Sequence, residues 1–306
     1  MKRKTCEVPV KPPGARASCP HILEKCGLKA RVPGKTGGFA RTSCSLLIAC
    51  CVLAVWIPGV CADKNPSPEQ LIALHLKSIG DPALLPKIES IAFTGTAEVE
   101  FLRGSFGNLR GASILVSQGP KMAITMEFSS NYHGEYIACD GKNVTVKNYD
   151  PGQRTPLADF LYVYNKIMKN GLLGGVYSNA WPLLDIGRNP ASMKIRKTKV
   201  KKTELYELEY RPKDYHNDMR IRLYFDTETF QHVRTHYYLG YGSAGYNTEP
   251  TLTETFEDFK KVGNLTLPHS YVIQLDRGPY LANWKIYVSE WTFNMPGINP
   301  KIFQAE

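Results

Sequence analysis

The sequence lacks an apolar run long enough to cross a membrane as a helix. A stretch of twelve uncharged residues from Leu46 to Ile57 ends at Pro58-Gly59, whereas a membrane-spanning helix needs about 20 apolar residues. Lys35 and Arg41 precede this stretch, and Val60-Cys61-Ala62 follows it. A basic region, a short apolar core and small residues, in that order, indicate a cleaved export signal rather than a membrane anchor.

We expect cleavage between Ala62 and Asp63. The alternative is LIAC (Leu47 to Cys50), which resembles the site where a bacterial lipoprotein is cleaved and acylated on its cysteine. That cut would leave only Leu46 to Ala49 as the apolar core, which is shorter than the usual core of about 7 to 15 residues. Residues 1–44 are either a long basic leader or the result of a start codon placed too far upstream. In both cases we place residues 1–62 outside the fold.

Cysteine and net charge are both scarce in the expected mature chain, residues 63–306. Seven of the eight cysteines lie before Asp63 and only Cys139 follows it, so no intramolecular disulfide and no cysteine-based zinc or redox site is expected. The first 62 residues also hold ten of the 38 Lys and Arg but two of the 28 Asp and Glu, which leaves 28 against 26. This near balance favours neither nucleic acid nor an anionic membrane as a partner.

Motifs of nucleophilic and dinucleotide chemistry are also lacking. No G-x-S-x-G occurs, and Cys139 lies between Ala138 and Asp140 rather than in a basic setting that favours a thiolate. GYGSAG (Gly240 to Gly245) matches G-x-G-x-x-G, but that fingerprint needs a helix that opens at the third glycine. Pro250 and a sequence without helical periodicity follow, so we interpret GYGSAG as a flexible loop.

Paired histidines and carboxylates give no catalytic or metal site. His232 and His236 have the spacing of zinc ligands on a helix, but they lie in a strand-like run, where four residues span about 13 Å. The pairs Glu98/Glu100 and Glu207/Glu209 are expected on a solvated face, without the burial that shifts the pKa of a catalytic acid. The sequence therefore predicts no enzyme, no metal site and no cofactor.

The residues from Asp63 onward suit one domain with a large core. Ser67-Pro68-Glu69-Gln70 predicts a helix start, with Ser67 as N-cap and Gln70 completing the capping box, and Gly80 ends the helix. We expect Leu71, Leu74, His75 and Ile79 on the buried face of this helix.

After Lys87 the apolar period changes to two. It runs through residues 93–101, 122–128, 219–225 and 265–275, and such alternation indicates antiparallel sheet with one wet face. Gly119-Pro120, Asp140-Gly141, Asp226–Thr229 and Gly263-Asn264 are short enough to join neighbouring strands as hairpins. We predict a mainly β (α+β) fold of ten to twelve strands, mostly in a meander.

One helical insert interrupts the strands, from Thr155-Pro156 to Gly171, with an apolar stripe at Leu157, Phe160, Leu161, Tyr164, Ile167 and Met168. LLGGVYSNAWPLLDI (Leu172 to Ile186) follows and carries no charge before Asp185. Its apolar residues form either a core plug, which we favour, or a mobile lid over an apolar cavity, hinged at Gly174-Gly175. In both cases the insert and the first helix cover the apolar face of the sheet.

Residues Lys194 to Lys202 hold six Lys or Arg in nine positions. The interleaved aromatics expected of a nucleic-acid surface are absent from this run. We favour a solvated hairpin, and contact with anionic lipid headgroups or an acidic partner is the alternative. Asn143-Val-Thr and Asn264-Leu-Thr are glycosylation sequons, which matter only in a eukaryotic secretory route.

The order of these features resembles the bacterial outer-membrane lipoprotein-sorting proteins, the LolA-like family. It comprises an export signal, a short helix, LLPKIESIAFTGTAEVEF, a meander broken by a helical insert, and strand pairs such as IRLYFDTETFQHVRTHY and FEDFKKVGNLTLPHSYVIQL. GLLGGVYSNAWPLLD and WTFNMPGINPKIF are closer to a divergent exported branch of that family. The resemblance covers residues 66–306.

This resemblance implies a half-open antiparallel β-barrel covered by two or more helices, in a single LolA-like domain over residues 63–306. It also implies an apolar cavity that receives acyl chains, and neither catalysis nor a cofactor. The arginine that known carriers use near the lid is not matched to a position here, and this chain is longer than theirs, so the cargo stays open.

We therefore predict a periplasmic, non-enzymatic and monomeric carrier or binding protein for lipoprotein acyl chains or other lipids. Envelope membrane proteins are further candidate partners, and nucleic acid is not. The expected ligand contacts are Leu161, Tyr164, Met168, Leu172, Leu173, Tyr177 and Trp181.

Two alternatives come from other functional classes. One is a regulatory envelope module that senses mislocalised lipoproteins, which a filled barrel with an exposed patch at Lys194 to Lys202 would favour. The other is a hydrolase, which would require His133, His232 or His269 to meet a carboxylate in a pocket.

Overall fold

The computed structural model describes residues 65–105, 107–128, 132–147, 152–213, 219–239 and 250–305. The expected export signal, its cut after Ala62, the alternative acylation at Cys50 and the GYGSAG loop lie outside these residues. The helices are α2 (Pro68–Ile79), α3 (Pro156–Val163) and α4 (Lys166–Lys169), with short 3-10 turns η1 (Leu85–Lys87), η2 (Gly175–Tyr177), η3 (Pro182–Leu184) and η4 (Pro300–Phe303).

The strands of the described residues are twelve in number. They are β1 (Ser90–Arg103), β2 (Gly107–Gln118), β3 (Lys121–Phe128), β4 (Gly134–Cys139), β5 (Val144–Val146), β6 (Ala191–Val200), β7 (Thr203–Pro212), β8 (Met219–Asp226), β9 (His232–Leu239), β10 (Thr251–Val262), β11 (Leu265–Asp276) and β12 (Leu281–Phe293).

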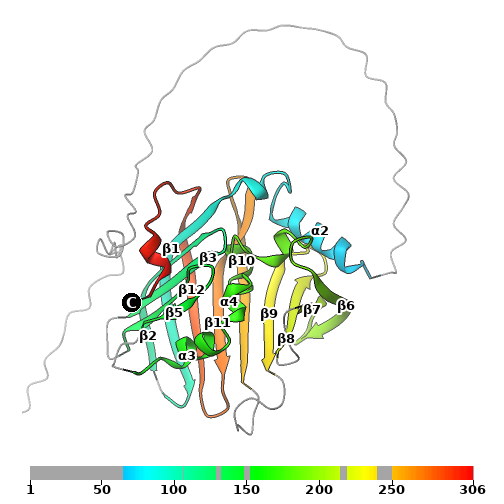
Figure 1. The fold of residues 1–306 in the computed structure, drawn as a ribbon. Coiled ribbons are helices and arrows are strands. Elements are labelled where there is room, and N and C mark those ends of the chain that lie inside the picture. Colours follow the sequence, from blue (N-terminus) through cyan, green and yellow to red (C-terminus); the bar gives the residue numbers. More distant parts are fainter. Residues whose placement is uncertain are drawn as a thin grey trace, which may run out of the picture. The chain divides into compact units, whose positions relative to one another are not determined.

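All twelve strands join one antiparallel sheet that curls and stays open (Figure 1). Its order is β5-β4-β3-β2-β1-β12-β11-β10-β9-β8-β7-β6. Each of the four predicted turns forms a hairpin. These hairpins join β2 to β3, β4 to β5, β8 to β9 and β10 to β11. The predicted fold class, a half-open antiparallel β-barrel covered by helices, is confirmed.

The two edges of the sheet explain where the helical insert lies. Strands β5 and β6 are consecutive in the chain but form opposite edges. Because neighbouring strands lie about 4.8 Å apart, eleven intervals correspond to about 53 Å in a flat sheet. The connection between β5 and β6 must therefore pass across the sheet. It carries α3, α4, η2 and η3, which Figure 1 shows lying over the strands.

Helix α2 confirms the predicted start and corrects the predicted buried face. The Ser67 hydroxyl accepts a hydrogen bond from the Gln70 N–H, and the Gln70 side chain accepts one from the Ser67 N–H. The buried residues are Leu71, Ile72, His75 and Ile79, whereas Leu74 is 37% exposed. The buried stripe is rotated toward Ile72 because α2 packs on both β11 and β6.

The second predicted helix is broken into two. Thr155 caps α3 as expected, since its hydroxyl accepts from the Ala158 N–H at 3.1 Å. The helix then ends at Val163, and α4 starts again at Lys166. β-branched Val163 and Asn165 are both weak helix formers, which favours a break at this point. The break lets the two short helices follow the curved inner face of the sheet.

A stability prediction follows from the cap of α2. Replacing Ser67 by Ala removes the hydroxyl acceptor and should lower the free energy of unfolding by about 1 kcal/mol. The measurement is the midpoint of urea unfolding at constant slope. Lys77→Gln, an exposed change on the same helix, should stay within about 0.5 kcal/mol, and an equal loss in both variants would contradict the role of the cap.

Candidate functional site

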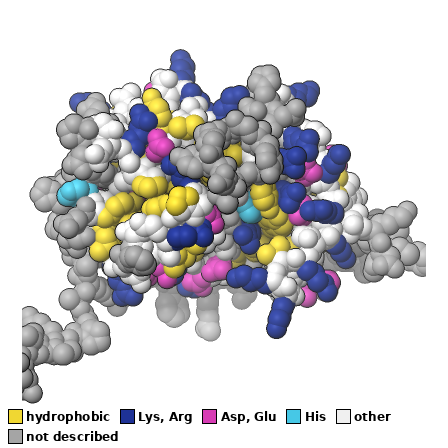
Figure 2. Space-filling model, turned by 90° about the horizontal axis from the view of Figure 1, so that it is seen from below, with side chains coloured by type: hydrophobic (Ala, Val, Ile, Leu, Met, Phe, Trp, Pro, Cys, Tyr) yellow, Lys and Arg dark blue, Asp and Glu magenta, His cyan; other side chains and the backbone are white. Residues whose placement is uncertain are grey.

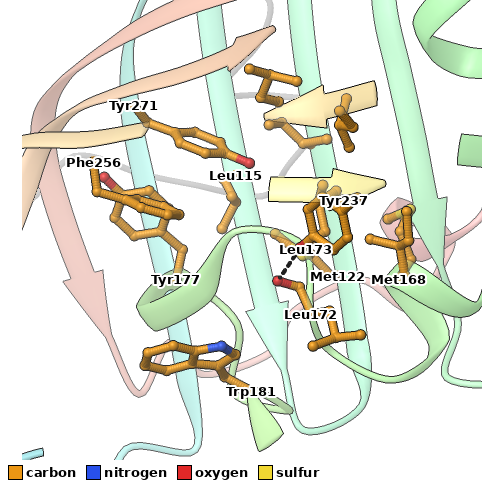
Figure 3. Packing of buried hydrophobic residues seen from close by; sticks show 14 of the residues in the cluster. Leu115, Met122, Met168, Leu172, Leu173, Tyr177, Trp181, Tyr237, Phe256 and Tyr271 are labelled. Atoms are coloured by element: carbon orange, nitrogen blue, oxygen red, sulfur yellow. Dashed lines mark hydrogen bonds between the residues drawn. The ribbon is translucent and has the colours of Figure 1, made fainter. Parts of the chain in front are cut away.

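Residues 172–186 pack as a plug against the inner face of the sheet, and they are termed the plug from here on. Leu172, Leu173, Tyr177, Trp181 and Leu183 are each at most 1% exposed. Figure 3 shows the Tyr177 side chain of the plug beside Phe256 and Tyr271 of the sheet. The core-plug interpretation of this segment therefore describes the structure, and the half-barrel is filled by the chain's own side chains.

Aromatic packing carries much of the contact between the plug and the sheet. The Tyr177 ring centroid lies 5.3 Å from that of Phe93, 5.8 Å from that of Phe256 and 5.3 Å from that of Tyr271. These rings meet edge to face, the arrangement in which aromatic pairs add energy beyond buried area. Tyr177 is the centre of the plug.

Polar bonds fix the plug at three places. At its start, the Gly174 N–H donates to the Glu254 carboxyl at 2.6 Å, and the Tyr237 hydroxyl lies 3.0 Å from the Leu172 carbonyl oxygen. In its middle, the Tyr177 hydroxyl donates to the Pro268 carbonyl at 3.0 Å.

Further along the plug, the Asn179 N–H donates to the Ser117 hydroxyl and its side-chain amide donates to the Ile88 carbonyl. Each bond satisfies a polar group that would be costly to bury alone. The plug is thus tied to β2, β9, β10 and β11.

Glu254 is the buried carboxyl of this network. It is fully buried on β10, and it accepts from the Gly174 N–H, from the Tyr237 hydroxyl at 2.7 Å and from the Tyr271 hydroxyl. Burial raises the pKa of Glu254 to about 7, although the three donors act in the opposite direction. A carboxyl with this pKa is present in both protonation states at neutral pH.

Two glycines let the plug approach the sheet closely. Gly174 and Gly175 have φ of 81° and 51°, in the left-handed region that side chains disfavour. A Cβ on Gly175 would lie 3.0 Å from Nδ1 of His232 and 3.2 Å from the Phe256 ring. The proposed hinge glycines are therefore also required by the packing of the plug.

A cluster of two histidines and a tryptophan joins α2 and β9 to the plug. His75 and His232 each lie 5.1 Å from Trp181 between ring centroids, and 6.1 Å from each other. Nδ1 of His75 donates to the Phe230 carbonyl and Nε2 of His232 donates to the Arg234 carbonyl.

Burial lowers the pKa of His75 to about 4 and that of His232 well below its usual range. Both rings are therefore neutral at pH 7.

An apolar groove lies beside α2 and has a volume of about 430 Å³. Its walls come from α2, from residues 85–91, from the plug and from the start of β11, with the apolar lining Leu76, Ile79, Leu85, Ile88, Ile91, Val176, Leu184, Leu265 and Leu267. Glu89, Asp185 and Arg188 are the charged residues among its lining. This α2 groove is a concave apolar site of the size that ligands use.

The seven residues predicted as ligand contacts do not line the α2 groove. Leu161, Met168, Leu172, Leu173, Tyr177 and Trp181 are buried in the core, and Tyr164 packs on it partly exposed. The plug contributes to the groove through Val176, Asn179, Leu184 and Asp185 instead. The apolar character of the plug was visible in the sequence, but which of its sides faces the groove was not.

The histidines weighed for hydrolysis are engaged elsewhere. His269 contacts the Leu267 carbonyl through Nδ1 and accepts from the Trp291 N–H at 3.2 Å. His232 is bonded as described above, and His133 is exposed. None of the three lines the α2 groove. A β-bulge lies in β9 opposite Tyr224 and Phe225 of β8. As a result, His232 lies in the core, whereas His236 stacks on Tyr238.

The carboxylate pair Glu207/Glu209 was expected on a solvated face, but it is only partly solvated. Glu207 is 4% exposed because Arg196 and Arg222 cover it, with Arg196 donating through Nε and one terminal nitrogen at 3.0 Å each. Lys199 pairs with Glu204 on the same hairpin at 3.2 Å. Figure 2 shows Lys and Arg gathered on the side of the molecule where β6, β7 and β8 lie. Cross-strand glutamates thus offset part of the basic run.

A second buried carboxyl lies away from the plug. Glu135 on β4 accepts from the Tyr132 hydroxyl and from the Thr155 hydroxyl at 2.6 Å. Burial raises the pKa of Glu135 to about 7. It therefore matches Glu254 in burial and pKa but has no bond to the plug.

Within the described residues, no group of three or more His, Cys, Asp or Glu is arranged to hold a metal ion. Within the same residues, no helix combines the length and the apolar character needed to cross a membrane.

Comparisons with known proteins bear on the fold. No protein-family model and no curated protein matches the chain. Among solved structures, it is similar to a LolA superfamily protein from Nitrosomonas europaea, with 13% identity over 74% of this chain and 98% of that one and a TM-score of 0.41.

A DUF1329 family protein from Desulfovibrio piger has 10% identity over 78% of this chain and 98% of that one, with a TM-score of 0.45. An outer membrane lipoprotein-sorting protein domain from Vibrio parahaemolyticus has 10% identity over 76% and 95%, with a TM-score of 0.39. Two of these three similar structures thus bear the names of the LolA superfamily and of outer membrane lipoprotein sorting.

The packing of the plug generates a prediction about Gly175. Gly175→Ala forces a side chain into the left-handed region and against His232 and Phe256, so it should destabilise the protein by more than the roughly 1 to 2 kcal/mol that this backbone conformation costs alone. Gly263→Ala is the matched control, since Gly263 has φ of 60° and open space around its Cβ. Equal losses in thermal unfolding would show that the close approach at Gly175 contributes nothing.

Proposed function

We propose that the protein is a non-enzymatic carrier or binding protein for an acyl chain of a lipid or lipoprotein. The α2 groove is the observation that carries this proposal. Its lining is mostly aliphatic and its charged residues are few. Each methylene moved from water into such a groove gains about 0.8 kcal/mol, so an acyl chain is the ligand that its chemistry favours.

The plug connects the groove to the predicted ligand contacts. Val176 and Leu184 face the groove, while Leu172, Tyr177 and Trp181 of the same segment fill the half-barrel. A chain that enters along the groove therefore meets the plug first. We propose that Leu161, Tyr164, Met168, Leu172, Leu173, Tyr177 and Trp181 contact the deeper part of the chain when the plug shifts.

The same proposal includes the cellular setting. The order of basic region, apolar core and small residues before Asp63 supports export to the periplasm, with cleavage after Ala62. The partners that we propose are lipid or lipoprotein acyl chains and, for delivery, envelope membrane proteins.

Binding of a fluorescent fatty acid tests the groove directly. Leu85→Glu and Leu184→Glu each place a charge in the apolar lining, and each should weaken binding at least about tenfold, since one buried leucine side chain contributes about 1.5 to 3 kcal/mol. Native mass spectrometry of the protein purified from a periplasmic fraction should show a co-purifying lipid.

Leu102→Glu is the control, because Leu102 is 45% exposed and lies outside the groove. It should bind as the wild type does. A wild-type protein with a clean mass and no uptake would contradict the carrier proposal. Uptake that both groove variants retain in full would instead place the ligand in the half-barrel.

A further inference from the structure

We propose that Glu254 is a proton-operated latch, in which loss of its proton loosens the plug and opens the interior of the half-barrel. The latch itself stands on the geometry of the plug. The further statement, that an acyl chain enters when the latch opens, rests on the function proposed above.

The latch joins the sheet to the most conformationally permissive part of the plug. Glu254 comes from β10, and its bond from the Gly174 N–H is one of the two polar ties between the start of the plug and the sheet, beside that of Tyr237 to Leu172. Gly171, Gly174 and Gly175 all have positive φ, so this stretch of backbone has the freedom of a hinge. If the Gly174 bond is lost, the hinge loses its tie to β10.

The network of tyrosines around Glu254 can form hydrogen bonds with the carboxyl in both of its protonation states. When Glu254 is ionised, Gly174 N–H, Tyr237 and Tyr271 all donate to it. When Glu254 is protonated, its O–H donates to the Tyr237 oxygen. The Tyr237 O–H then donates to the Leu172 carbonyl, 3.0 Å away. The protonated network therefore holds the plug at Leu172 as well as at Gly174.

Among the described residues, the groups that act on the pKa of Glu254 are the Tyr271 and Tyr237 hydroxyls and the Gly174 N–H, and none of them is a cation. Burial and the Glu254 charge both raise the pKa of Tyr177 in the plug. His75 and His232, which pack on Trp181 of the plug, are neutral and favour closure above their own pKa values. Glu254 is thus the group that favours opening as pH rises.

The direction of the effect follows from linkage. The pKa of Glu254 is about 7 with the plug in place, and it returns toward 4.5 when water reaches the carboxyl. Between these values the closed state keeps a proton that the open state releases. The equilibrium constant for opening should therefore rise through Glu254 by about 40-fold in total from pH 5 to 7, and level off above pH 7.

Hydrogen exchange at residues 171–178, converted to protection factors from pH 5 to 8, measures this opening. Glu254→Gln keeps an oxygen for the Gly174 N–H and amide donors for Tyr237, but it cannot ionise. We expect the ratio of opening constants, wild type over Glu254→Gln, to rise at least tenfold between pH 5 and 7. Taking the ratio cancels the contribution of His75 and His232.

Glu135→Gln is the matched control, because it removes a buried carboxyl of the same pKa that has no bond to the plug. Its pH profile at residues 171–178 should follow that of the wild type. A ratio for Glu254→Gln that stays constant within about threefold would overturn the latch. The latch would also be overturned if Glu135→Gln flattened the pH profile of opening at residues 171–178 as much as Glu254→Gln does. The pH dependence would then come from the stability of the whole fold and not from the bond to the plug.

Tyr271→Phe provides a second test that does not depend on folding of the Gln variant. It removes one donor to the carboxylate, which disfavours ionisation. The rise in opening should then continue to a higher pH than in the wild type. An unmoved profile would contradict the latch.

Uptake of a fluorescent fatty acid by the same proteins separates the latch from the proposed function. An uptake rate that follows the opening constant from pH 5 to 7 supports both. If opening depends on Glu254 but no fatty acid is taken up at any pH, the result supports the latch and contradicts the carrier function. If uptake is independent of Glu254 and of pH, the result supports the carrier function and contradicts the latch.

Discussion

The structure depends on one topological constraint, which is that β5 and β6 form opposite edges of the same twelve-stranded sheet. The chain between them has to span the sheet, and it does so over the inner face, which is lined by apolar side chains from nearly every strand. A connection of this length could have run outside as a solvated loop. Here its residues 172–184 carry no charge, so burying them under the curled sheet covers the apolar face that would otherwise remain in water.

An apolar connection still brings its backbone polar groups with it, and these require partners inside the core. Glu254, Tyr237 and Ser117 provide them for backbone groups of Gly174, Leu172 and Asn179. The Pro268 and Ile88 carbonyls accept from the side chains of Tyr177 and Asn179. The plug is therefore held by a few directional bonds within a large area of non-directional packing. These polar bonds specify one position for the plug within the core.

The plug has two sides, and this links the interior to the surface. Its inner side replaces whatever apolar ligand could occupy the half-barrel, while Val176 and Leu184 on its outer side form part of the α2 groove. Any ligand that moves from the groove inward competes with Leu172, Tyr177 and Trp181 for the same surface. The buried neutral histidines on the α2 side and the buried carboxyl on the sheet side make that competition sensitive to protons in opposite directions.

The sequence by itself determined the elements whose signals are local. Period-two alternation, short turn motifs and the Ser67 capping box predicted the strands, the hairpins and the start of α2, because each depends on neighbours within a few residues. Residues 172–186, uncharged before Asp185, were also predicted to help cover the sheet.

Tertiary structure alone decided the rest: which side of α2 is buried, where the second helix breaks, that Glu207 lies beneath two arginines, and that Glu254 meets Gly174 from 80 positions away. These features rest on contacts between distant segments, which no local pattern encodes. The α2 groove is of the same kind, since it exists only where four separate stretches of chain come together.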